Sequence, residues 1–240
     1  MTFGSDREGR EGMFCVESYM QDVIGLLKEK FGNRLCYVGL QGSYLRGEAT
    51  EGSDLDVVVV IDGVLPQDLL IYRQIISGLE SYEKSCGFLC GREELKNWNP
   101  LEICNFLHGT RDYYGKITDF LPEFTREDVV NFIKVSVGNL YHEITHRYVH
   151  ANWEKNKCKL PGSYKSVFFI LQSVYYLQSG VFYQTKAELM QCLSQRDRMV
   201  MEKGADLANR ADYDFEEAFS LLFTWCREIL YRKEYENVHL

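Results

Sequence analysis

The sequence predicts an α/β (α+β) domain in its N-terminal half, followed by an all-α helical bundle. Two patterns support this fold class. As far as residue 121, short runs rich in β-branched residues alternate with apolar residues at helical spacing. Beyond Pro122, apolar residues recur almost only at helical spacing. We therefore expect a flexible tail over residues 1–13, a first domain over 14–121 and a second over 122–240.

The first domain is expected to begin with a helix and to continue into strands. Apolar residues at helical spacing predict a helix over 14–31, which Gly32 ends. Pro66 and the periodic residues of 69–79 predict another helix. Strands are expected where short apolar or β-branched runs occur, at 35–40, 54–62 (with four consecutive valines), 87–90 and 101–106.

The second domain is expected to consist of helices. Thr125 and the two acidic residues that follow it provide a helix cap and a negatively charged first turn. A long helix should then run to about Tyr148, and residues 156–162, which include Pro161, form a polar break. Three further helices are predicted over 164–177, 186–193 and 215–231.

Composition narrows the classes of partner. The chain of 240 residues is 45% hydrophobic and 14% aromatic, which is typical of a folded protein with a core. Its net charge of −8 disfavours a nucleic-acid backbone as partner and favours a cationic small molecule, or a nucleotide neutralised by metal ions. Eight cysteines without a CxxC pair, no recognisable signal peptide and no long apolar run predict a cytoplasmic protein outside the membrane.

Gly42-Ser43 and the carboxylates Asp54 and Asp56 carry the predicted chemistry. Side chains alternate along a strand, so Asp54 and Asp56 should leave the same face, about 7 Å apart. Two such carboxylates repel one another unless a divalent cation lies between them, and Mg²⁺ prefers oxygen ligands. Gly42 allows a backbone to approach a phosphate closely, and Ser43 can donate hydrogen bonds to it. This equipment suits metal-dependent nucleotidyl transfer.

A third carboxylate would complete such a site. Glu102 is our candidate as second-metal ligand or general base, because it lies on the predicted strand 101–106. Glu93 and Glu94 compete for this role.

The stretch Gly42-Ser43-x-x-Arg-Gly-Glu-Ala-Thr-x-x-Ser53-Asp54-x-Asp56 resembles the signature of the DNA polymerase β-like nucleotidyltransferase superfamily. Together with the helical second half, it is most similar to aminoglycoside adenylyltransferases of the streptomycin/spectinomycin type. The resemblance covers 39–62 and extends more loosely to residue 116. It implies that the paired aspartates bind Mg²⁺, that the serine loop holds the ATP phosphates and that a third acid assists the acceptor hydroxyl.

A second similarity to these adenylyltransferases covers residues 171–186. It implies that Lys186 approaches the nucleotide phosphates, although a solvated residue at the start of a helix is the alternative. An arginine of that family falls at Ser173, where this chain departs from the pattern and puts the usual drug substrates in doubt.

Two other features have alternative explanations. Arg46, in the loop that leaves Ser43, contacts a phosphate or braces the loop by pairing with Glu48 or Glu51. Histidines at positions 142, 146 and 150 share one helical face, which favours a polar helix face over a metal site because no HExxH spacing is present.

We therefore expect an enzyme that moves AMP from ATP, with Mg²⁺, to a hydroxyl of a small cationic acceptor and releases pyrophosphate. An aminoglycoside-like antibiotic would make it a resistance enzyme. The alternatives are AMP transfer to a protein, a toxin–antitoxin type transferase and a nucleotide-binding regulator without turnover. The expected metal and catalytic residues are Asp54, Asp56 and Glu102, and the expected nucleotide-binding residues are Gly42, Ser43, Arg46, Ser53 and Lys186.

Overall fold

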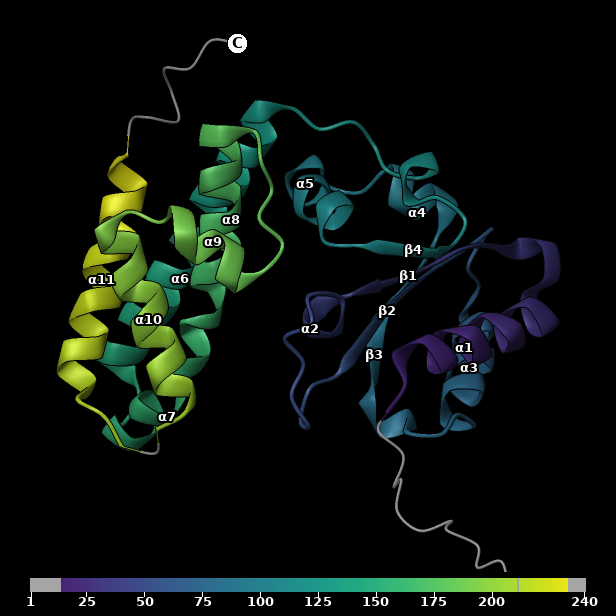
Figure 1. The fold of residues 1–240 in the computed structure, drawn as a ribbon, viewed down its shortest axis with the longest axis horizontal. Coiled ribbons are helices and arrows are strands. Elements are labelled where there is room, and N and C mark those ends of the chain that lie inside the picture. The colour runs from purple at the N-terminus through teal and green to yellow at the C-terminus, as the bar shows by residue number, and fades with distance from the viewer. Residues whose placement is uncertain (1–13, 211, 233–240) are drawn as a thin grey trace, which may run out of the picture. The chain divides into compact units, whose positions relative to one another are not determined.

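The structure is a computed structural model that describes residues 14–210 and 212–232 (Figure 1). The predicted tail lies outside these residues. The chain forms two compact units: Met1–Lys96 with Thr110–Phe120, called the first unit below, and Asn97–Gly109 with Leu121–Leu240, called the second unit. The segment 97–109, which sequence analysis assigned to the first domain, therefore packs with the helical half.

The first unit is built on a four-stranded mixed sheet. Strands β1 (Leu35–Gln41), β2 (Leu55–Ile61), β3 (Ser85–Gly91) and β4 (Arg111–Tyr114) lie in the order β3-β2-β1-β4. Strand β1 is antiparallel to β2 and β4, whereas β2 and β3 are parallel. The four valines of β2 are almost fully buried, as suits the central position of that strand.

Helices α1 (Val16–Phe31) and α3 (Pro66–Ser77) cover one face of this sheet (Figure 1). Alternate residues of β2 point toward them, so that Leu55 and Val57 share a core with Val23 and Leu27 of α1. The intervening residue, Asp56, therefore points to the opposite face of the sheet.

Short elements complete the first unit. The helical turn α2 (Gly42–Leu45) follows β1, and α4 (Arg92–Lys96) follows β3. Three 3₁₀ turns lie at Gly32–Arg34, Tyr82–Lys84 and Ile117–Asp119. Arg34 donates hydrogen bonds of 3.1 and 2.6 Å to both carboxylate oxygens of Asp68. Asp68 also accepts from the backbone of Leu65, which closes a cap on α3.

The second unit is helical. Its helices are α5 (Pro100–His108), α6 (Arg126–His150), α7 (Trp153–Ser163), α8 (Lys165–Ser179), α9 (Lys186–Cys192), α10 (Gln195–Ala208) and α11 (Phe215–Tyr231). Helices α6, α8 and α11 bury a common core around the fully enclosed Ile144, Leu171 and Trp225. Among the described residues, no helix combines the length and apolar character needed to cross a membrane.

The predicted fold class is confirmed: a mixed sheet with helices is followed by a helical part. The predicted strand over 101–106 is wrong, because this segment lies within α5. Asn99 caps that helix by accepting from the Leu101 backbone, and Pro100 occupies its first turn. Strand β4 and helix α10 were not foreseen.

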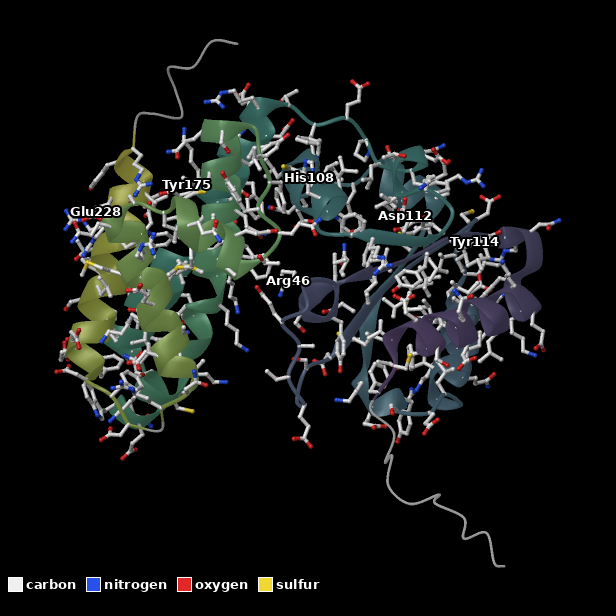
Figure 2. The ribbon with its side chains drawn as sticks, in the orientation of Figure 1. Arg46, His108, Asp112, Tyr114, Tyr175 and Glu228 are labelled. Atoms are coloured by element: carbon white, nitrogen blue, oxygen red, sulfur yellow. The ribbon has the colours of Figure 1, made fainter. Side chains whose placement is uncertain are left out.

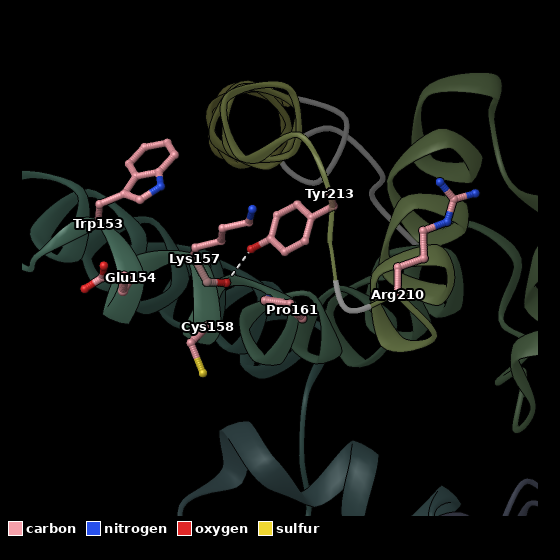
Figure 3. A pocket seen from close by; sticks show the side chains of 7 residues that line it. All are labelled: Trp153, Glu154, Lys157, Cys158, Pro161, Arg210 and Tyr213. Carbon is pink, nitrogen blue, oxygen red and sulfur yellow. Dashed lines mark hydrogen bonds between the residues drawn. The ribbon is translucent and has the colours of Figure 1, made fainter.

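The predicted polar break at 156–162 is also wrong, because these residues belong to α7. Pro161 has no N–H and therefore leaves the carbonyl of Lys157, four residues earlier, without its helical donor. The hydroxyl of Tyr213 donates to that carbonyl instead (Figure 3). A hydrogen bond from outside the helix thus compensates for the missing N–H of the proline. No local sequence pattern predicts this bond, because its donor lies far along the chain.

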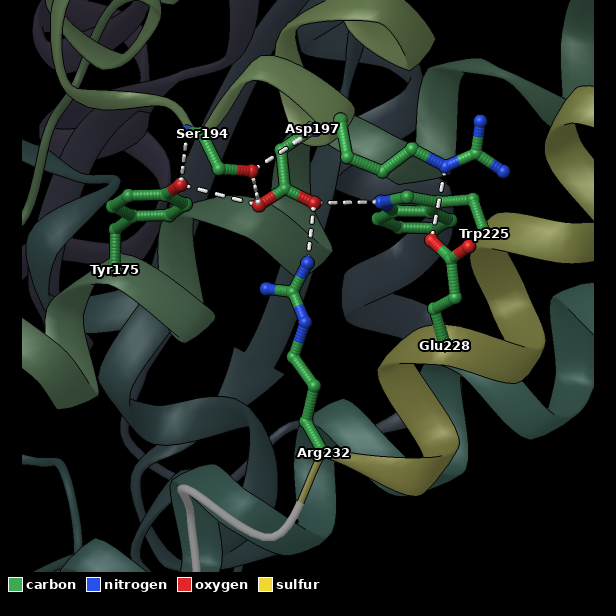
Figure 4. A network of polar contacts seen from close by, with 7 residues as sticks. Tyr175, Ser194, Asp197, Trp225, Glu228 and Arg232 are labelled. Carbon is green, nitrogen blue, oxygen red and sulfur yellow. Dashed lines mark hydrogen bonds and ion pairs between the residues drawn. The ribbon is translucent and has the colours of Figure 1, made fainter.

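A buried carboxylate, Asp197, joins three helices of the second unit (Figure 4). It is fully enclosed and accepts from Tyr175 on α8 at 3.1 Å, from Trp225 on α11 at 2.9 Å and from Arg232 after α11 at 2.8 Å. The Ser194 hydroxyl at the start of α10 donates to it at 2.8 Å. Burial by itself raises the pKa of Asp197, but Arg232, Trp225 and Ser194 more than offset this effect and hold the pKa below its usual value.

Replacing Asp197 with Asn should strongly destabilise the second unit. The variant removes the buried carboxylate charge that pairs with Arg232, and breaking such an ion pair costs on the order of 3 kcal/mol of unfolding free energy. Urea denaturation followed by circular dichroism measures the change. Asp212→Asn is the matched control, because the Asp212 side chain is 90% exposed although it lies 2.5 Å from Lys157. Equal stability of the Asp197→Asn variant and the wild type would contradict this role.

The same comparison should depend on pH in a defined direction. Because the folded-state pKa of Asp197 is lowered, its contribution is present above the ordinary aspartate pKa of about 3.9 and is lost as the pH falls through the folded value. The difference in unfolding free energy between wild type and Asp197→Asn should therefore be constant near neutral pH and shrink in strong acid.

Candidate active site

The site begins where β1 ends. Gly42 has a φ of +73°, in the left-handed region that favours glycine, and opens the turn α2 that carries Ser43. A Cβ atom at Gly42 would lie 1.9 Å from Oδ2 of Asp56. The Asp56 carboxylate therefore lies directly against the Gly42 backbone, and only a residue without a side chain permits this approach.

Asp54 and Asp56 lie at the start of β2. Asp54 is exposed and immediately precedes the strand, and Asp56 is half-buried on the face that α1 and α3 leave uncovered. Burial raises the pKa of Asp56; the Cys86 thiol opposes this effect, Asp54 adds to it, and Arg46 opposes it. A carboxylate disfavoured in its charged form, beside a second carboxylate, is a place where a divalent cation would stabilise both.

Two residues flank Asp56 in the sheet. Gln41 lies opposite on β1, where its Nε2 donates to the Thr110 hydroxyl at 2.6 Å. Cys86 lies beside Asp56 on β3, and its exposed thiol lowers the pKa of that carboxyl. Neither flanking residue is a carboxylate. Asp112 of β4 (Figure 2) lies opposite Gly39 and contacts Lys116 at 3.4 Å.

The aspartate pair fits a hard divalent cation, although it does not enclose one. In the described part of the chain, no three His, Cys, Asp or Glu side chains are arranged to hold a metal ion. Asp54 and Asp56 offer oxygen ligands, and Mg²⁺ usually completes its coordination shell with water and substrate phosphate. An open pair of carboxylates beside a glycine turn suits a metal that arrives with a nucleotide.

Arg46 and Ser53 have structural partners in the loop between β1 and β2. The Arg46 guanidinium (Figure 2) lies 3.0 Å from Glu48, and both side chains are less than one-fifth exposed. The ion pair by which Arg46 was expected to brace the loop is thus present, whereas a contact of Arg46 with phosphate stays a prediction. The Ser53 hydroxyl accepts from the Thr50 backbone at 2.8 Å and holds the turn before Asp54.

Glu102 does not lie where sequence analysis placed it. It is exposed on α5 in the second unit, and Trp98 Nε1 donates to its carboxylate at 2.5 Å. The strand that motivated its selection does not exist, so its role as third acid stays a prediction without that support. Among its competitors, Glu93 pairs with Lys96 at 3.3 Å and Glu94 packs against Gly91.

Lys186 also belongs to the second unit. It is the first residue of α9, behind a capping box formed by Thr185 and Glu188, and its Nζ lies 6.0 Å from the centre of the Phe168 ring. Its contact with phosphates stays a prediction. Ser173 is fully buried on α8 and accepts a hydrogen bond of 3.2 Å from Asn105 of α5. The small residue at this position therefore fastens two helices of this unit together.

The three histidines of α6 form an exposed row. Ring centroids are 5.7 Å apart for His142 and His146, and 4.7 Å apart for His146 and His150. All three side chains are exposed, which agrees with a polar helix face.

The glycine turn and the aspartate pair lie in a stretch with a recognised family. Residues 21–105 match the nucleotidyltransferase domain family, and this range includes Gly42, Ser43, Asp54 and Asp56. The chain therefore carries a nucleotidyltransferase domain of the DNA polymerase β-like type and is a transferase.

The fold resembles that of one particular adenyltransferase. A spectinomycin adenyltransferase from Enterococcus, determined with ATP and spectinomycin, has a TM-score of 0.57 and 14% sequence identity over 90% of this chain and 99% of its own. At this identity the likeness shows a shared fold. No curated protein sequence matches the chain at a significant level.

Replacing Gly42 with Ala should impair the enzyme. The new Cβ would displace the Asp56 carboxylate, and a displacement of about 1 Å at a catalytic group can cost roughly 100-fold in rate. Steady-state nucleotidyl transfer measures the loss. Gly47→Ala is the matched control, because Gly47 has a similar φ of +67° but nothing within 4 Å of its Cβ position. Equal losses of transfer rate in the two variants would show that backbone strain alone causes the effect, and would contradict the role of the Asp56 contact.

Proposed function

We propose that this protein transfers AMP from ATP to a hydroxyl of a small cationic acceptor, with Mg²⁺, and releases pyrophosphate. The observation that carries the proposal is the Asp56 carboxylate held against the Gly42 turn, with Asp54 beside it, inside the nucleotidyltransferase domain. A phosphate-binding turn and metal-binding carboxylates thus meet at one end of one sheet.

The residues of the first unit have distinct tasks in this proposal. Asp54 and Asp56 would hold the metal ion, which when bound would neutralise the triphosphate and polarise its α-phosphorus. The Ser43 hydroxyl and the backbone amides of α2 donate to phosphate oxygens, and Gly42 leaves room for that approach. The acceptor oxygen forms a bond to the α-phosphorus as the bond to pyrophosphate breaks, and the hydroxyl proton passes to a general base, for which Glu102 stays the candidate.

The second unit binds the acceptor in this proposal, and Lys186 contacts the phosphates. Support for a small cationic acceptor comes from the net charge of −8 and from the fold shared with an enzyme determined with ATP and spectinomycin. A hydroxyl-bearing antibiotic is the first class to examine, which would make this a resistance enzyme. The cytoplasm, where ATP and Mg²⁺ are available, is the proposed location.

Replacing Asp54 or Asp56 with Asn should lower Mg²⁺-dependent AMP transfer by about 1,000-fold or more, because the metal loses its charged ligands. Release of pyrophosphate from ATP measures this, and circular dichroism verifies the fold. Asp62→Asn is the matched control, since Asp62 directly follows the same strand and its side chain is 54% exposed. Full activity of both the Asp54 and the Asp56 variants would exclude the proposed function.

The acceptor can be identified in a separate experiment. A panel of hydroxyl-bearing antibiotics, cationic and neutral, is incubated with ATP, and pyrophosphate release is followed. We expect release with a cationic member and none with the neutral ones. Label from α-³²P ATP that appears on proteins of a cell lysate would instead indicate a protein AMP-transferase. Tight ATP binding without pyrophosphate release in the presence of any acceptor would indicate a nucleotide-binding regulator without turnover.

A further inference from the structure

The loop between α8 and α9, residues 180–185, is tied to the core of the second unit by a buried side chain. Gln172 of α8 is only 4% exposed, and its Nε2 donates to the backbone carbonyls of Tyr183 at 2.7 Å and Gln184 at 3.4 Å. A buried amide needs hydrogen-bond partners, and here the amide nitrogen serves two consecutive carbonyls of one loop. Gln172 therefore fixes where the end of this loop lies relative to α8.

Helix α5 holds the same loop through two further contacts. The Phe182 ring stacks on the His108 ring with centroids 4.8 Å apart, and Gln184 donates to the His108 carbonyl at 2.9 Å. Burial lowers the pKa of His108, which keeps this ring uncharged at neutral pH and suited to packing among aromatic side chains. Because Asn105 of α5 also donates to Ser173 of α8, the two helices that hold the loop are joined to each other.

The loop leads directly into Lys186. The Thr185 hydroxyl accepts from the Glu188 backbone at 3.1 Å, and the Glu188 carboxylate accepts from the Thr185 backbone at 2.9 Å. This capping box fixes the first turn of α9, which begins at Lys186. Lys186 follows Gln184 by two residues, so the carbonyl that Gln172 holds lies close before it in the chain. The position of the Lys186 backbone is thus set by the contacts of the loop.

We propose that Gln172 is a positioning residue for nucleotide binding, whose amide holds the loop between α8 and α9 so that Lys186 presents its ammonium group to the phosphates of ATP. The inference rests on the proposed function, because that function assigns Lys186 to the phosphates. A lysine carries its charge on a flexible four-carbon stem, so its contacts depend on where the backbone places it. Without the Gln172 contacts, the loop has more freedom, and ordering it on binding reduces the affinity for ATP.

Replacing Gln172 with Met tests this role, because Met is of similar length and adaptable in a core but donates no hydrogen bond. The equilibrium Kd of ATP with Mg²⁺ is measured by calorimetry on the full-length protein, without an acceptor. We expect the Kd to rise about tenfold. Gln178→Met is the matched control, since Gln178 is an exposed residue of the same helix, and it should leave the Kd unchanged. A wild-type Kd in Gln172→Met would overturn the proposal.

A double-mutant cycle separates positioning of Lys186 from a general loosening of the fold. Lys186→Met alone should weaken ATP binding at least as much as Gln172→Met does. Adding Gln172→Met to Lys186→Met should weaken it no further, because the loop then has no ammonium group to position. Additive losses would show that Gln172 does not act through Lys186, and a wild-type Kd in Lys186→Met would show that this lysine does not contact phosphate. Either result would overturn the proposal.

A second variant covers the case in which Gln172→Met does not fold, as judged by circular dichroism. Gln184→Ala then takes its place in the cycle, since this exposed side chain ties the same loop to α5. We expect weaker ATP binding that again depends on the presence of Lys186, and a wild-type Kd or an additive loss would overturn the proposal.

The two proposals can fail separately. If Gln172→Met binds ATP as the wild type does while Asp54→Asn and Asp56→Asn lose AMP transfer, the role of Gln172 is wrong and the proposed function stands. If those two variants transfer AMP normally, the proposed function is wrong whatever the Kd values show.

Discussion

The contact between the Asp56 carboxylate and the Gly42 backbone is the constraint on which the candidate site depends. It exists because β1 and β2 are antiparallel neighbours, which brings the end of one strand to the start of the other. Leu55 and Val57, buried against α1 and α3, fix the register of β2 and so hold Asp56 on the opposite face. A shift of β2 by one residue would turn the Asp56 carboxylate toward the core and turn Leu55 and Val57 away from it. The register that packs the core is therefore also the register that forms the candidate site.

The surroundings of the fully buried Asp197 and the half-buried Asp56 distinguish a structural carboxylate from a candidate functional one. Asp197 is enclosed by donors from Tyr175, Trp225 and Arg232, and its pKa lies below the usual value. Its charge is satisfied within the protein, and it stabilises the helical unit. Asp56 is disfavoured as an anion, because burial raises its pKa and its neighbour Asp54 repels it. Arg46 and Cys86 offset this effect in part, and a cation from outside would relieve it further, which is typical of a functional carboxylate.

The sequence predicts those parts of the fold and site that depend on local patterns. Consecutive valines predict β2, and the two aspartates at alternate positions beside them predict the carboxylate pair of the candidate site. The segment 101–106 forms a helix although its pattern predicts a strand, because its span is too short to distinguish the two and the preceding Asn99-Pro100 pair starts a helix. Cys86 could not be found, since its place beside Asp56 follows from parallel pairing across the whole of α3.

Neither residue beside Asp56 in the sheet is a carboxylate, so this candidate site differs from a site with three acidic residues side by side. The first unit offers a glycine turn and two carboxylates at one end of its sheet, and the sheet neighbours of Asp56 are Gln41 and Cys86. Under the proposed function, deprotonation of the acceptor hydroxyl is therefore a task for a base that does not neighbour Asp56 in the sheet. Metal binding by the aspartate pair and proton removal from the acceptor would then depend on different residues.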